Sequence, residues 1–207
     1  MAQPAVAHAD GKKRRPHRRD QILDAAMELF HAKGYHATGM DEIGAAAGIT
    51  GPGVYRHFKS KEQILATGAR AAVAEALERS RAIVESTDSP RQAFDGLIAN
   101  FVEGLIANRA LSGVVMRERH ALSTATRRLV ERAERLHVEE WVNVLSHMRP
   151  DLSDAEARMM VHAALWTCLS VAYFESGIDP VREAGVLEAM VRAALLSGAD
   201  RPPAAKR

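Results

Sequence analysis

The sequence predicts an all-α protein in which a small N-terminal helical domain precedes a larger helical one. After residue 17, apolar residues recur at intervals of three and four along almost the whole chain, and helix start signals precede most of these segments. The chain shows neither hairpin-forming strand pairs nor βαβ alternation. A length of 207 residues allows one large domain or two smaller ones.

The first two predicted helices are bounded by clear start and stop signals. Apolar residues at helical spacing occupy residues 18–33, and Gly34 can then adopt the left-handed conformation of a helix end. Thr38 is expected to cap a second helix over residues 40–47, because its hydroxyl can satisfy first-turn amides. Gly48 ends this helix.

A third, short helix follows Gly48, with Thr50 as its expected cap and residues 54–58 as its expected extent. So short a helix does not persist alone in water, so apolar neighbours must hold it. The expected neighbours are Ile22, Leu29, Phe30, Ile43 and Leu65. Together the second and third helices form a helix-turn-helix pattern.

Six further helices complete the prediction. They are expected over residues 61–86, 90–108, 111–120, 124–148, 154–174 and 181–197. The first of them is long enough to connect the two domains. The expected organisation is a disordered basic arm (1–17), a helix-turn-helix domain (18–66), a helical ligand-binding and dimerisation domain (67–200) and a flexible tail (201–207).

Composition and charge narrow the class of protein. Residues 12–61 contain ten Lys or Arg and five Asp or Glu, a net charge of +5, whereas the rest of the chain carries −3. This asymmetry favours a polyanion as partner of the N-terminal part. The single cysteine, Cys168, cannot form an intramolecular disulfide, and no apolar run is long enough to span a membrane. We therefore expect a cytoplasmic protein without a membrane anchor.

Several short motifs resemble the DNA-binding domain of TetR/AcrR-type transcriptional regulators. They are Gly34–Thr38, Met40–Gly44, Ala47–Thr50 and Val54–Lys61. The resemblance covers about residues 18–66. It implies a homodimer whose C-terminal domain binds a small molecule and thereby controls the spacing of two recognition helices.

Nine residues are the candidate DNA contacts. By the resemblance, Tyr55 and His57 match positions that contact the DNA backbone, and Lys61 matches a phosphate-binding lysine. Arg56 is long enough to reach a guanine edge or a phosphate. Where the family more commonly has a polar residue, Gly and a polar residue, this chain has Gly51, Pro52 and Gly53. Of these, Pro52 and Gly53 can offer only apolar or close backbone contacts.

Thr38 and Thr50 complete the candidate DNA site, because helix starts favour anions. The alternative is that both threonines are caps and nothing more. The basic run within residues 12–19 either enters a minor groove or is a solvated tail. The alternative for Tyr55 is that it fills the small core, which is the expected role of Phe58.

The last two helices are the expected dimer interface. Residues 154–174 are apolar on nearly every side, and residues 181–197 present an apolar face too broad for a monomer. A two-fold dimer would match a roughly palindromic operator in double-stranded DNA. The expected effector is apolar, and its candidate contacts are Phe101, Met116, His120, Trp141, His162 and Trp166.

Three other functions are alternatives to that of an effector-released repressor. The chain lacks the HExxH, paired CxxC, GxSxG and phosphate-loop motifs, so an enzyme, a metal or another cofactor is not expected. A DNA-binding regulator without any ligand has the same sequence features and stays open, as does an activator in place of a repressor.

Overall fold

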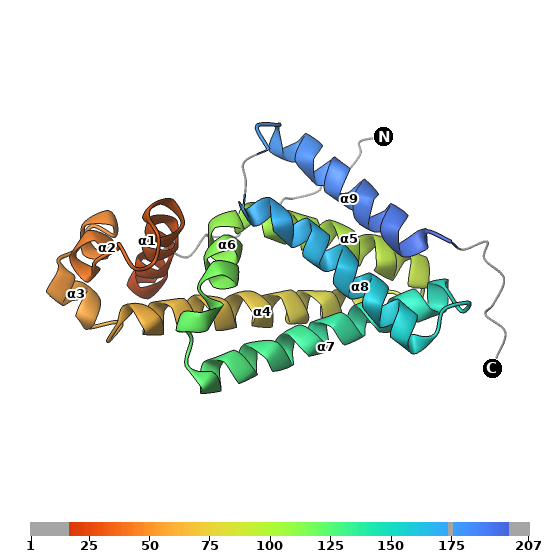
Figure 1. The fold of residues 1–207 in the computed structure, drawn as a ribbon, viewed down its shortest axis with the longest axis horizontal. Helices are drawn as coiled ribbons and strands as arrows, with labels where there is room; N and C mark the ends of the chain where they lie inside the picture. The colour runs from red at the N-terminus through yellow and green to blue at the C-terminus, as the bar shows by residue number, and fades with distance from the viewer. Residues whose placement is uncertain (1–16, 174–175, 199–207) are drawn as a thin grey trace, which may run out of the picture.

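The computed structural model describes residues 17–173 and 176–198, which are helical and contain no strand, in agreement with the prediction (Figure 1). The α-helices are α1 (Arg18–Lys33), α2 (Met40–Ala46), α3 (Gly51–Tyr55), α4 (Lys61–Glu85), α5 (Pro90–Ala107), α6 (Arg109–Arg117), α7 (Thr124–Met148), α8 (Asp154–Leu169) and α9 (Pro180–Leu196). Two short 3-10 helices, η1 (Arg119–Ala121) and η2 (Ser170–Tyr173), follow α6 and α8. Except for His17, the predicted arm and tail lie outside the described residues.

Helix α4 joins the two parts of the molecule. Helices α1–α3 lie at one end, and α4 runs from them along the larger helical part (Figure 1). There α4 packs on α5 and α7, while α9 packs on α5 and α8. The long connecting helix expected from the sequence is therefore confirmed.

Most predicted helices have the expected bounds, but the third does not. It begins at Gly51 and ends at Tyr55, whereas residues 54–58 were expected. The hydroxyl of Thr50 accepts a hydrogen bond from the Gly53 amide at 3.3 Å, and Pro52, whose φ suits a first helical turn, follows directly. The segments expected over 111–120 and 154–174 each divide into an α-helix and a 3-10 helix.

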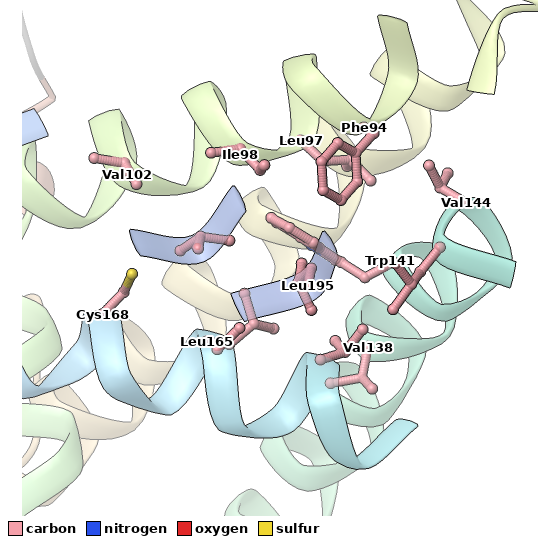
Figure 2. Packing of buried hydrophobic residues seen from close by; sticks show 14 of the residues in the cluster. Phe94, Leu97, Ile98, Val102, Val138, Trp141, Val144, Leu165, Cys168 and Leu195 are labelled. Carbon is pink, nitrogen blue, oxygen red and sulfur yellow. The ribbon is translucent and has the colours of Figure 1, made fainter. Parts of the chain in front are cut away.

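Two apolar clusters form the interior. The C-terminal cluster surrounds Trp141, which lies between the Phe94 and Leu97 side chains of α5 and Leu165 of α8 (Figure 2). The N-terminal cluster joins side chains of α1–α4 and includes Phe58, which is fully buried as expected. It also contains Val114, Leu122 and Val130, which belong to the larger part of the chain.

Within the described ranges, none of the helices combines the length and apolar character that a membrane crossing requires.

Candidate DNA-binding site and effector residues

Helices α2 and α3 touch through their backbones at a glycine. A Cβ added at Gly44 would lie 2.9 Å from the Gly51 nitrogen and 3.0 Å from the carbonyl oxygen of Ile49. Gly48 has a φ of +68°, a conformation that lets the chain turn sharply between the helices. These positions fix the angle at which α3 leaves α2.

Replacing Gly44 with alanine is therefore expected to lower the free energy of unfolding by about 1–3 kcal/mol, because backbone atoms must move to admit the methyl group. Urea unfolding followed by circular dichroism measures this change. Gly104→Ala is the matched control, since a Cβ there meets nothing within 4 Å and helix propensity alone should raise stability by up to about 1 kcal/mol. Equal effects of the two substitutions would contradict the close approach.

One side of the α3 segment packs into the N-terminal cluster, and the opposite side is exposed to solvent. Val54 and Phe58 are fully buried in the N-terminal cluster, together with four of the five expected neighbours, whereas Leu29 is only partly buried. On the outer side Thr50, Pro52 and Arg56 are exposed, and Tyr55 has 55% of its surface accessible, so it does not fill the core. His57 is half-buried beside them, whereas Gly51 and Gly53 are buried.

Thr38 does not have the predicted role. Gly39 is the N-cap of α2, and its amide donates to Glu42 Oε2 at 2.9 Å. The Thr38 side chain is only 2% exposed, and its hydroxyl donates to the carbonyl oxygen of Gly34 at 2.9 Å. The hydroxyl therefore links α2 to the end of α1 and does not face DNA.

Lys61 is also engaged inside the protein. Its ammonium group donates to the carbonyl oxygens of Tyr35 at 2.8 Å, His36 at 3.2 Å and Thr38 at 2.7 Å. An ammonium group has three donors, so these bonds use all of them. The lysine fixes the start of α4 to the α1–α2 connection, and its contact with phosphate stays a prediction.

Other basic side chains of this part of the chain divide between internal and outward roles. The guanidinium group of Arg19 lies 4.5 Å from the centre of the Phe58 ring, and Arg18 donates to the carbonyl oxygen of Ala47 at 3.3 Å. Arg56 and Lys59 are both exposed and lie three residues apart, directly after the end of α3. Lys59 was not among the predicted DNA contacts, although its position in the net-positive segment of the sequence could have indicated it.

The six predicted effector residues do not gather in one place. Phe101 and Trp141 meet edge to face in the interior, with 5.9 Å between ring centres, and Met116 is half-buried in α6. His120 is exposed in η1. His162 and Trp166 are exposed on α8, so they do not share a pocket with Trp141. An open polar hollow of about 440 Å³ near Arg19 is lined by none of the six.

A buried polar group does lie beside Trp141. The Ser80 hydroxyl and His137 Nδ1 are 3.2 Å apart, and the His137 ring packs near those of Phe101 and Trp141. Neither His137 Nε2 nor Trp141 Nε1 has a hydrogen-bond partner in the structure. Ser80 was not among the predicted site residues, although a serine on the apolar face of a long helix could have indicated a buried polar contact.

The outer faces of α8 and α9 are apolar and uncovered in the single chain. Met159 and Trp166 project from α8, and Val186 and Met190 project from α9. Their intervals of seven and four residues place each pair on one helix face.

A short helix held at a fixed angle by a glycine contact, with Tyr55 and Arg56 exposed on it, identifies a helix-turn-helix DNA-binding protein. The family model for bacterial regulatory proteins of the tetR family matches residues 22–67. Residues 22–67 therefore form a DNA-binding domain of the tetR type, and the chain as a whole is similar to transcriptional regulators of that family.

Two similar proteins illustrate this likeness. The transcriptional repressor KstR2 of Mycobacterium tuberculosis is 28% identical over 77% of this chain and 82% of its own length. Its solved structure, titled as a ketosteroid transcriptional regulator, has a TM-score of 0.75 at 24% identity and covers 88% of this chain and 95% of its own. AibR, solved with isovaleryl coenzyme A and operator DNA, has a TM-score of 0.68 at 20% identity and covers 84% and 97%. At these identities the two structures show a common fold.

Proposed function

We propose that the protein is a homodimeric repressor that leaves its operator when a small apolar effector binds. The exposed face of α3 is the observation that carries this proposal. Tyr55, Arg56 and Lys59 project from a segment whose buried side is anchored in the core, so they are available to a DNA groove and its phosphates. KstR2, a repressor, supports the direction of control.

The apolar face of α8 and α9 supports the homodimer. Contiguous exposed apolar surface is unfavourable in water, and two copies of this face would cover each other. Because a two-fold interface uses the same surface on both subunits, it would place two α3 helices on one operator. The predicted site residues His162 and Trp166 then belong to this interface and not to the effector site.

The buried group around Trp141 supports an effector with a polar end. Indole Nε1 is only a donor, and a buried donor without an acceptor is unfavourable. An apolar molecule carrying a carbonyl or carboxylate oxygen would supply the acceptor and replace part of the apolar packing. The ketosteroid regulator KstR2 and the isovaleryl coenzyme A complex of AibR are consistent with such molecules.

Binding of the purified protein to DNA from its own upstream region tests the function. We expect a saturable, sequence-selective complex that weakens steeply with salt. Arg56→Ala should raise the dissociation constant by about 10-fold or more, because it removes a base or phosphate contact. Arg135→Ala, an exposed arginine on α7, should leave the dissociation constant unchanged.

The absence of any selective complex on a library of genomic fragments at low salt would refute the regulator function proposed for this site. The same complex serves as the assay for effectors, with isovaleryl coenzyme A, a ketosteroid and a long-chain fatty acid as first probes. If a broad set of apolar probes leaves the complex intact, the protein is a regulator without a ligand.

A further inference from the structure

Three potential metal ligands from two parts of the fold converge on one point. His36 lies in the connection between α1 and α2, Glu118 ends α6, and His120 lies in η1. Glu118 Oε2 is 3.8 Å from His36 Nε2 and 3.7 Å from His120 Nε2. A donor atom from each residue lies within 4.8 Å of the other two.

One oxygen of the carboxylate at the centre of this group has no hydrogen-bond partner in the structure. Glu118 Oε2 is a buried atom without a donor, on a side chain that is 16% exposed. The neighbouring cations are engaged elsewhere: Arg117 contacts His31 Nδ1 at 3.1 Å, and Arg119 binds Glu134 through both of its terminal nitrogens. A buried acceptor without a donor is unfavourable, so the position favours a cation.

The donor set selects a class of cation. Two imidazole nitrogens and one carboxylate oxygen suit zinc and its first-row neighbours, whereas calcium and magnesium prefer all-oxygen sites. Zinc bonds of about 2.0–2.2 Å place tetrahedral ligand atoms roughly 3.3–3.5 Å apart. The two measured gaps exceed this by a few tenths of an ångström. The histidine side chains, 76% and 70% exposed, have room to move inward.

We propose that His36, Glu118 and His120 bind a divalent first-row transition metal, of which zinc is the model, and that the ion clamps the DNA-binding helices to the larger domain. His36 belongs to the same connection that Lys61 fixes to α4, so it is part of the N-terminal helical domain. Glu118 and His120 move with α6 and η1. A metal bound by all three favours one orientation of α3 relative to the larger domain and so changes DNA affinity.

This proposal goes beyond repression by an apolar effector, and it departs from the expectation that no metal is involved. Sequence motifs did not reveal the site, because His36 is distant in sequence from the other two ligands and the pair Glu118 and His120 is not a recognised motif.

Zinc binding to the full-length protein tests the site without DNA. After dialysis against a chelator, we expect one tight equivalent of zinc per chain in competition with a chromogenic chelator at neutral pH. Cobalt at the same site should give the visible absorption of a low-symmetry complex. Glu118→Gln and His120→Ala should each weaken zinc binding more than about 10-fold.

His147→Ala is the matched control, because this exposed histidine lies on α7 away from the group and should leave binding unchanged. The exposed His120 can be removed without unfolding, which circular dichroism of the metal-free variants verifies. If wild type, Glu118→Gln and His120→Ala bind zinc equally, the site is refuted.

The clamp has its own readout. Zinc should change the operator dissociation constant of the wild type and leave that of Glu118→Gln unaffected. An operator affinity that zinc does not alter, in a protein that binds it tightly, overturns the clamp. The zinc titration contains no DNA, so its result does not depend on whether the protein binds an operator. The metal site and the regulator function can therefore be refuted independently.

Discussion

Trp166→Asp is expected to convert the proposed homodimer into monomers and to weaken operator binding more than about 100-fold. Trp166 is 53% exposed on the outer face of α8, and aromatic residues buried in a protein interface contribute several kcal/mol to association. A carboxylate there would be buried without a partner in the dimer. Sedimentation equilibrium at micromolar concentration measures the change in mass, and the operator assay measures its consequence.

Leu129→Asp is the control for the interface. Leu129 is also 53% exposed but lies near the start of α7, outside the α8 and α9 face. This variant should keep the mass of the wild type. A dimer that survives Trp166→Asp and dissociates in Leu129→Asp would place the interface elsewhere.

The second large expected effect is a loss of folding stability at acid pH, caused by the buried His137. Burial lowers the pKa of this imidazole from 6.5 to about 4. Between these values the unfolded chain binds more protons than the folded one, so the free energy of unfolding falls as the pH is lowered through this window. Relative to neutral pH, the titration of His137 should lower the free energy of unfolding by about 2 kcal/mol at pH 5 and by about 3 kcal/mol below pH 4.

Urea unfolding at pH 7.5 and pH 5 measures this change. His137→Phe should lose the pH-dependent part, whatever its stability at pH 7.5, because phenylalanine does not titrate. His147→Ala should retain the behaviour of the wild type, since that histidine is exposed. Equal losses of stability in the wild type and His137→Phe would show that other groups dominate the acid response.

The helices could be predicted from the sequence because their signals are local. The periodicity of residues 18–33 and the Ser153 to Glu156 capping box each depend on residues within one or two turns. The third helix was misplaced because Gly51 and Pro52 discourage a helix interior yet suit its first turn. Its start depends on a single hydroxyl, that of Thr50.

The candidate sites were only partly predictable, since their contacts join distant segments. Lys61 and Thr38 have residue types that suit phosphate, but the backbone carbonyl groups that they contact are positioned by tertiary structure. Periodicity placed Trp166 on an apolar face without showing whether that face meets the core or a second chain. The contact between Ser80 and His137 joins α4 to α7, which no local pattern reports.

The N-terminal cluster has a consequence for how such regulators can be recombined. Val114, Leu122 and Val130 are almost fully buried in it, so the larger helical part of the chain contributes to the core beneath the DNA-binding helices. A chimera joined near residue 67 would replace these side chains with those of a foreign sensor and leave voids or clashes against α1 and α4. A transplant of operator specificity has to carry these three positions with it.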